Sequence, residues 1–215
     1  MSDIKSAVAS ALDVEQRTPE WFADRLGYTT ASCFKHVLAK TKSGPAASRK
    51  KYMVQVALEI ITGKKADGFI NQAMQRGIDI EPNARMAFEA KTGHMVLEVG
   101  FIKHATIRAG ASPDGLIGDE CGLEIKCPEM NTHFDTLISG MDPEHQAQIQ
   151  GQMWITGRSN WFFVSYDDRF PPGADLYIQE VPRDDKYIAN LEKEVIAFNK
   201  EVDSAVITIQ KLLEK

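Results

Sequence analysis

Residues 112–128 read SPDGLIGDECGLEIKCP, two short runs of strand-forming residues on either side of a turn. A hairpin centred on position 119 pairs residues whose numbers sum to 238, so Asp114 is expected opposite Glu124, and Ser112 opposite Lys126. Side chains alternate between the two faces of a strand, which puts Glu124 and Lys126 on one face and their apolar neighbours on the other. The stretch therefore predicts an antiparallel hairpin with one apolar face and one charged face.

The two carboxylates of this hairpin need a counter-charge. Opposed residues of an antiparallel pair have Cβ atoms about 4.5–5.5 Å apart, and like charges at that separation repel. Mg²⁺, or Mn²⁺ in its place, would relieve the repulsion, because hard cations take carboxylate, carbonyl, water and phosphate oxygens as ligands. Lys126 would then orient or activate a water, and such a set suits hydrolysis of a phosphodiester. A surface hairpin whose Asp114, Glu124 and Lys126 pair only with one another is the alternative.

Composition limits the class of protein. The chain has 215 residues, of which 43% are hydrophobic and 26% charged. This composition is typical of one globular domain and not of an intrinsically disordered protein. Its apolar runs are shorter than a membrane span and its first residues lack a signal pattern, so we expect a soluble, cytoplasmic protein without membrane contact. The odd set of cysteines, without a CxxC pair, indicates reduced thiols rather than disulfides or a metal cage.

Charge is unevenly distributed along the chain. Residues 1–65 hold 11 Lys and Arg against 6 Asp and Glu, a local charge of +5, whereas the whole chain carries −5. The remainder is therefore −10. A basic N-terminal lobe on an acidic body is compatible with a polyanionic partner, although scatter over a solvated surface would give the same numbers.

Periodicity and turn residues divide the chain into three segments. Residues 1–93 are expected to be mostly helical, residues 94–182 to form a sheet with one crossover helix, and residues 183–215 to form a C-terminal helix. The whole chain is expected to be an α/β domain with a mixed sheet. The apolar residues of the terminal helix favour packing on its own sheet, with a contact to a subunit or partner as the minority alternative. Helices are expected from Pro19, from a cap at Thr30 through Ala39, in the run that reaches Ile61 and ends at Gly63, at 80–92 and at 143–156. Strands are expected at 95–103, 107–117, 122–127, 160–166 and 175–181, and a basic, mobile loop at 40–51.

At Pro113-Asp114 and Glu124-Ile125-Lys126 the sequence resembles the PD-(D/E)xK nuclease superfamily, and within it the family of lambda exonuclease and the YqaJ-like viral recombinases. The likeness is collinear over nearly the whole chain. It implies a restriction-endonuclease-like core with a central mixed sheet flanked by helices and a helical N-terminal lobe. The stretches that carry it are WFADRLGYTTAS (21–32), GIDIEPNARMAFE (77–89), SPDGL, LEIKCP, AQIQGQMWITG (147–157) and YDDRF (166–170).

The resemblance implies a metal-dependent, processive 5′-to-3′ exonuclease on linear double-stranded DNA. Such an enzyme releases 5′-mononucleotides and leaves a 3′ single strand for recombination by single-strand annealing. The resemblance also implies double-stranded DNA ends as substrate, a ring-shaped homotrimer and a single-strand annealing protein as partner. The gene would belong to a phage or prophage and the protein would act in the bacterial cytoplasm.

The resemblance also assigns roles to individual residues. Asp114 and Glu124 would bind the metal together with the Ile125 carbonyl, and Lys126 would act on the nucleophilic water. Glu81 would hold a metal-bound water, and Gln148 would position the water from the crossover helix. Taken singly, Glu81 is equally typical of a first helical turn and Gln148 of a solvated helix face.

A second group of residues would bind the DNA end. Arg25 and Ser32 would form a pocket for a terminal 5′ phosphate, since guanidinium donates two hydrogen bonds to phosphate and a helix N-terminus favours anions. Met74 would separate the terminal base pairs, and Lys42 would contact the minor groove. The resemblance places Trp21, Thr30 and Ser112 in the same DNA-binding group, although Trp21 alone is more typical of a core residue.

Competing functions remain open on the sequence alone. An endonuclease or a repair nuclease of the same superfamily would need the same carboxylates and lysine. A DNA-end binding protein without turnover would need only the basic N-terminal lobe.

Overall fold

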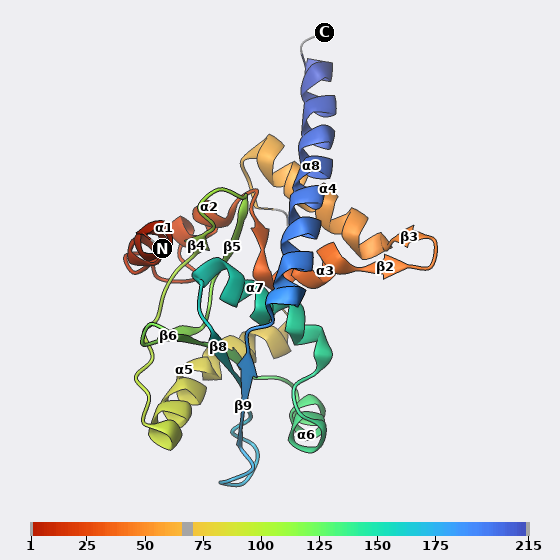
Figure 1. Cartoon of the computed structure of the whole chain (residues 1–215). Helices are drawn as coiled ribbons and strands as arrows, with labels where there is room; N and C mark the ends of the chain where they lie inside the picture. The colour runs from red at the N-terminus through yellow and green to blue at the C-terminus, as the bar shows by residue number, and fades with distance from the viewer. Residues whose placement is uncertain (1, 66–70, 214–215) are drawn as a thin grey trace.

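The computed structural model describes residues 2–65 and 71–213. Its centre is a sheet of order β6-β7-β8-β9, in which β6 and β9 run antiparallel to their neighbours and β7 runs parallel to β8. Gly115 lies opposite Leu123, so the hairpin has the predicted register. The mixed α/β architecture with flanking helices is confirmed (Figure 1). The strands are β6 (Gly115–Ile117), β7 (Cys121–Lys126), β8 (Asn160–Tyr166) and β9 (Leu176–Pro182).

The parallel pair β7-β8 needs a crossover connection, and helices supply it. The predicted helix at 143–156 is confirmed as a 3-10 turn, Pro143–His145, followed by α7 (Gln146–Thr156), which is buried over most of its length. A second crossover helix, α6 (Met130–Ser139), was not predicted. Its apolar residues Met130, Phe134 and Ile138 recur every four positions, as on one face of a helix, but that face is exposed rather than part of the core.

The strand expectations at 95–103 and 107–117 were partly wrong. Of the described residues in these stretches, only Ile102–Lys103 (β4), Ala109–Ala111 (β5) and β6 form strands. β4 and β5 pair in a separate small sheet of order β1-β5-β4 with β1 (Thr29–Thr30). The run 107–117 is divided because Pro113 has no amide hydrogen for a ladder, so β5 ends before it and β6 begins after it. This break leaves Asp114 at the junction of the two sheets.

The N-terminal segment is mostly helical, as predicted, with three corrections. Thr30 ends β1 and stands at the N-cap position of the 3-10 turn Ala31–Cys33, which leads into α3, but its side chain makes no capping hydrogen bond. The loop 40–51 is not irregular: β2 (Lys40–Thr41) and β3 (Gly44–Pro45) form a hairpin that projects from the body in Figure 1. Helix α5 begins at Gln72 rather than Ile80, because the Asn71 side chain accepts from the Met74 amide. The remaining helices are α1 (Ser2–Ala11), α2 (Pro19–Arg25), α3 (Phe34–Leu38), α4 (Ala47–Thr62) and α5 (Gln72–Thr92).

Glycine allows α5 to approach the sheet closely. A Cβ on Gly77 would lie 3.2 Å from the Cys127 carbonyl oxygen, tighter than ordinary contact. Gly77 thus lets α5 pack beside the end of β7, and the Glu81 side chain, one turn later, is carried to the charged face of the hairpin.

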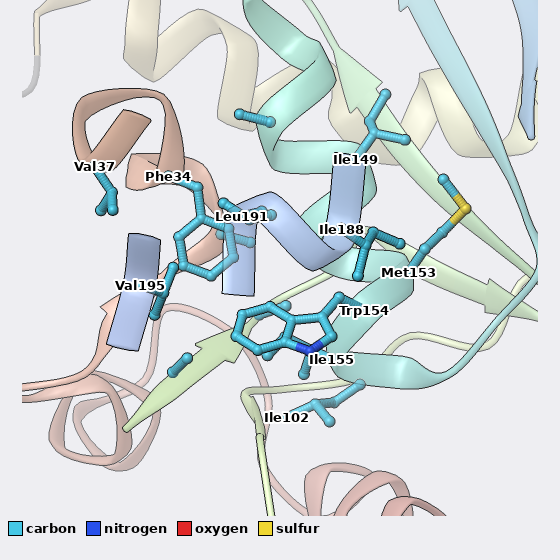
Figure 2. Packing of buried hydrophobic residues seen from close by; sticks show 14 of the residues in the cluster. Phe34, Val37, Ile102, Ile149, Met153, Trp154, Ile155, Ile188, Leu191 and Val195 are labelled. Carbon is cyan, nitrogen blue, oxygen red and sulfur yellow. The ribbon is translucent and has the colours of Figure 1, made fainter. Parts of the chain in front are cut away.

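The main core lies around α7. Phe34 from α3 and the α7 residues Ile149 and Met153 pack against α8 (Asp185–Leu213) through Ile188 and Leu191 (Figure 2). The terminal helix packs within its own chain, but against the helices α3, α4 and α7 rather than on the sheet as predicted, and its buried residues reach Val206. Its C-terminal end extends beyond the body in Figure 1. Within the described part of the chain no helix combines the length and apolarity that crossing a membrane requires.

Candidate active site

A cavity of about 240 Å³ lies where the charged face of the hairpin meets α2, α5 and α7. Segments far apart in the sequence contribute to its wall, so only the folded chain forms it. Every predicted site residue except Lys42 and Met74 lines this cavity. The lining comprises Gln16, Arg17, Trp21, Arg25, Thr30, Ala31, Ser32, Glu81, Ser112, Asp114, Glu124, Ile125, Lys126, Gln148 and Gln152.

Asp114 occupies the point where the chain passes from the small sheet to the central one. Its amide donates to the Leu123 carbonyl at 3.2 Å, and its Oδ2 accepts from the Ile125 amide at 2.7 Å, so the carboxylate is held against β7. Burial raises the pKa of Asp114 well above its usual value, and the carboxylates of Glu124 and Glu81 raise it further. Three acidic groups therefore share a desolvated site.

Glu124 is held by three donors. Its Oε1 accepts from Lys126 Nζ at 2.5 Å and from Gln148 Nε2 at 2.6 Å, and its Oε2 accepts from Gln152 Nε2 at 2.5 Å. Burial alone would lower the pKa of Lys126, but the Glu124 and Asp114 carboxylates outweigh it and the pKa is raised. Lys126 is thus a fixed ammonium group, which also lies 3.2 Å from Gln148 Oε1.

The acidic wall suits a hard divalent cation. Among residues 2–65 and 71–213, no three Asp, Glu, His or Cys side chains converge closely enough to form a metal cage by themselves. The set here comprises the carboxylates of Asp114 and Glu124 with the backbone of Ile125, and Mg²⁺ requires only one or two carboxylates because it keeps several waters. Burial and the nearby carboxylates of Glu124 and Glu81 raise the pKa of Asp114, and a bound cation would offset both effects.

Arg25 forms a separate, positively charged part of the same cavity. Its Nη1 donates to Ser112 Oγ at 2.8 Å, and its guanidinium lies 4.2 Å from the centroid of the Trp21 ring. Trp21 Nε1 also donates to Ser112 Oγ, at 3.0 Å, which leaves the serine hydroxyl hydrogen available to another acceptor. Burial lowers the pKa of Arg25. No carboxylate of the described residues lies within ion-pair distance of it.

Hydroxyl groups complete this positive corner. Thr30 Oγ1 lies 3.4 Å from Ser32 Oγ, and both residues line the cavity with Arg25 and Ser112. A half-buried guanidinium without a carboxylate partner, surrounded by hydroxyl groups, is chemistry suited to an anion such as phosphate.

A family model for the YqaJ-like viral recombinase domain matches residues 20–159, a span that contains the cavity residues from Trp21 to Gln152. The chain belongs to the YqaJ-like viral recombinase family. The fold and family expected from the sequence are therefore confirmed.

Solved structures agree with the family assignment. An alkaline exonuclease from Laribacter hongkongensis, LHK-Exo, is 45% identical with a TM-score of 0.85, over 92% of this chain and 98% of that one. Its complex with dAMP gives 44% identity and a TM-score of 0.86 over the same shares. A phage-related exonuclease from Haemophilus somnus 129PT has the same fold, with a TM-score of 0.68 at 14% identity over 85% of this chain and 96% of that one. A putative uncharacterized Escherichia coli protein, ExoD, is 32% identical over 65 residues, 30% of this chain and 74% of its own length.

Lys42 and Met74 lie outside the cavity. Lys42 is in the turn of the β2-β3 hairpin, and the Met74 side chain is 53% exposed in the first turn of α5. Their expected contacts, with the minor groove and with the terminal base pair, would be to parts of the DNA that lie outside the cavity. Both roles stay predictions.

Three further polar residues line the cavity and were not predicted. Gln152 follows Gln148 by four residues and so shares its helix face, a signal that helical periodicity could have supplied. Gln16 Nε2 donates to the carbonyls of Val99 and Pro113, both at 2.8 Å, and so supports the chain next to Asp114. Arg17 gave no sequence signal, because a single arginine in a turn is unremarkable.

Proposed function

We propose that this YqaJ-like protein is a metal-dependent exonuclease that degrades the 5′ strand of linear double-stranded DNA and releases 5′-mononucleotides. The observation that carries the proposal is the presence, in one cavity, of the acidic hairpin with its lysine and of the unpaired Arg25 with its hydroxyl groups. A terminal 5′ phosphate held by Arg25 would keep the end of the strand at a fixed distance from the carboxylates. Cleavage would then remove one nucleotide at a time.

The mononucleotide product is supported by the structural neighbour. LHK-Exo, 44% identical over most of the chain, was solved with dAMP. dAMP belongs to the class of product that hydrolysis at the 3′ side of each phosphorylated terminal nucleotide would release.

The chain's own residues would divide the chemical work. Mg²⁺ bound by Asp114, Glu124 and the Ile125 carbonyl would supply Lewis-acid polarisation of the phosphoryl oxygen and lower the pKa of a coordinated water. Lys126 Nζ and the Gln148 side chain, fixed on Glu124, would orient the attacking water toward the phosphorus. The water oxygen would form the new bond to phosphorus and lose a proton to solvent. The bond between phosphorus and the 3′ oxygen would break, and the leaving oxygen would take up a proton from solvent.

A digestion assay tests the proposal. We expect purified protein with Mg²⁺ to release soluble nucleotides from linear duplex bearing 5′ phosphates, more slowly from duplex with 5′ hydroxyl ends, and not at all from closed circular duplex. Arg25→Ala should remove the preference for 5′ phosphate, because the guanidinium recognises that group, and Lys126→Ala should reduce cleavage by about 10²–10³-fold.

Two results would contradict the proposal. Cleavage of closed circles would indicate an endonuclease, and cleavage by Lys126→Ala at the wild-type rate would remove the assigned chemistry. Salt-sensitive binding to DNA ends without any soluble product would instead indicate an end-binding protein.

The processive, ring-shaped homotrimer and the annealing partner belong to the same proposal. A ring around DNA would keep the enzyme on its substrate between cuts, and the remaining 3′ strand would be the substrate of a single-strand annealing protein. Light scattering at working concentration should give the mass of a trimer, and a monomer there would exclude the ring.

A further inference from the structure

Arg17 has an unusual backbone conformation. Its φ is +70°, and among the described residues no other non-glycine residue has a positive φ. It lies in the connection between α1 and α2, directly before Thr18, whose side chain caps α2. Glycine adopts the left-handed region freely, whereas a side chain with a Cβ is strained there. Backbone strain of this kind persists where the side chain serves a purpose.

The ion pair of Arg17 stabilises the fold too little to explain its strained backbone. Arg17 Nη2 donates to Glu81 Oε2 at 2.6 Å, but the arginine side chain is 40% exposed. An ion pair so accessible to water contributes little to folding. Glu81 also has a second arginine, Arg85, whose Nη2 lies 3.8 Å from its other oxygen.

Of the cations that line the cavity, Arg17 can most readily exchange its present partner for another anion. Lys126 is committed to Glu124, and Arg25 is anchored on Ser112 and stacked on Trp21. Arg17 reaches the cavity from its exposed side and holds a carboxylate by a contact open to water. A phosphate group offers a guanidinium the same paired oxygen acceptors as a carboxylate, so DNA entering the cavity would compete with Glu81 for Arg17.

We propose that Arg17 is a substrate-binding residue that donates to the non-bridging oxygens of a DNA phosphate in the cavity and leaves Glu81 when the strand enters. The inference rests on the proposed function, because the phosphate belongs to the nuclease substrate. It adds a second arginine to the substrate contacts, separate from the pocket at Arg25. The exchange also frees the Glu81 carboxylate to face the acidic cluster once a cation is bound there.

Three variants and one control test this role. Arg17→Gly removes the guanidinium and the strain together, Arg17→Met removes the guanidinium alone, and Arg17→Lys keeps the charge without the planar fork. Arg108→Met is the matched control, because Arg108 also makes a single ion pair of 2.6 Å, with Asp203, and lies outside the cavity lining. The probe is a short linear duplex with 5′ phosphates, bound in the presence of Ca²⁺ over a series of salt concentrations, with cleavage measured in Mg²⁺.

We expect Arg17→Gly and Arg17→Met to bind the duplex about tenfold more weakly than wild type. The slope of the logarithm of the binding constant against the logarithm of salt concentration should fall in magnitude by about 0.9, the change for one lost phosphate contact. Arg17→Lys should keep the slope, and Arg108→Met should keep both the slope and the affinity. Arg17→Gly should melt about 2–4 °C higher than Arg17→Met, because only the glycine relieves the backbone.

The outcomes separate the two proposals. Unchanged salt slopes in both charge-removing variants, with active wild-type enzyme, would overturn the role of Arg17 alone. A loss of melting temperature in Arg17→Gly that parallels its loss of activity would also overturn it, since a structural ion pair would behave in that way. A wild-type protein that neither cuts linear duplex nor binds it in a salt-dependent manner would overturn the proposed function itself.

Discussion

Two aspartates near neighbouring strands of the central sheet, Asp167 and Asp114, differ in their hydrogen-bond partners and in the direction in which their pKa is shifted. Asp167, directly after β8, is fully buried, yet Arg169 donates to both its oxygens at 2.8 and 2.7 Å and Arg76 donates at 3.0 Å. Burial alone would raise the pKa of Asp167, but these guanidinium groups outweigh it and the pKa is lowered. Asp114 receives one backbone hydrogen bond and faces two other carboxylates, and its pKa is raised.

The comparison separates a structural carboxylate from a functional one. Arg76 belongs to α5, so its bonds to Asp167 tie that helix to the end of β8 and thereby support Glu81 on the same helix. Lys126 and the Ile125 amide compensate the charge of Asp114 only in part, and its pKa stays raised. A bound cation would add to that compensation, and strongly shifted carboxylates of this kind are typical of functional sites.

The largest effect should follow from removing the charge at Asp114. Asp114→Asn keeps an oxygen to accept from the Ile125 amide but weakens cation binding, so we expect cleavage to fall by about 10²–10³-fold or more. In EDTA the same variant should be more stable than wild type by up to about 1 kcal/mol, because a repulsive charge is lost. Nuclease assays and thermal melts measure the two effects.

The pH dependence of that stabilisation has a defined sign. Because the pKa of Asp114 is raised in the folded protein, ionisation costs stability as pH rises from the usual aspartate range through the folded value. The advantage of Asp114→Asn should therefore be absent in acid and grow as pH rises above the usual aspartate range. Equal melting temperatures for variant and wild type at neutral pH in EDTA would show that the acidic cluster carries no unbalanced charge.

Removing the charge at Asp167 should have the opposite effect on stability. Asp167→Asn removes the buried carboxylate that Arg76 and Arg169 share, so we expect a loss of about 1–3 kcal/mol. The loss should be less than for a fully buried pair, because both guanidinium groups reach water and keep a second carboxylate, Asp168 and Glu129. The pKa of Asp167 is lowered, so its contribution is present above the usual aspartate pKa and is lost as pH falls through the folded value. The deficit should thus shrink in acid, as chemical denaturation at neutral and acidic pH would measure.

Activity distinguishes the two aspartates further. Asp167→Asn should keep wild-type cleavage per folded molecule well below its melting temperature, since the residue does not line the cavity. Activity lost in a variant that is still folded would place Asp167 among the functional groups and remove the distinction.

Local rules were sufficient for the hairpin that carries Asp114. Turn residues at the centre and alternation along β7 determine which side chains oppose one another, and the observed pairing of Gly115 with Leu123 matches the predicted register. The family pattern then selected most of the residues that line the cavity. These features depend on contacts between neighbours in sequence or on a motif.

Features that depend on distant contacts were not predicted. Arg76 and Asp167 meet across 91 positions, and nothing local marks either as a partner of the other. Helix α5 continues through Gly77, which packs closely against the Cys127 carbonyl, whereas in the sequence this glycine resembles a helix breaker. The left-handed backbone of Arg17 is likewise visible only in the folded chain.

The smallest effect on cleavage should come from substituting a buried glutamine on α7. Two glutamines of this helix differ as the two aspartates do, one contacting the cavity and the other only the backbone. Gln152 donates to Glu124 Oε2, whereas Gln150 donates to the Pro182 carbonyl at 2.9 Å and accepts from the Asp184 amide at 2.8 Å. Gln152→Met should leave stability within about 1 kcal/mol, because the Oε1 of Gln152 is itself buried without a hydrogen-bond partner and its removal offsets the lost donor.

Cleavage by Gln152→Met should nevertheless fall about tenfold at limiting Mg²⁺, because supporting hydrogen bonds hold metal-binding carboxylates in place. Gln150→Met is the matched control and should show the reverse: a loss of about 1–3 kcal/mol from unpaired backbone groups, with the Mg²⁺ dependence unchanged. Titrating Mg²⁺ in cleavage assays of both variants, alongside thermal melts, measures the difference. If the two variants instead had the same Mg²⁺ dependence, Gln152 would be only a packing residue. Gln148 would then be the one α7 glutamine, of Gln148 and Gln152, with a role in the proposed reaction.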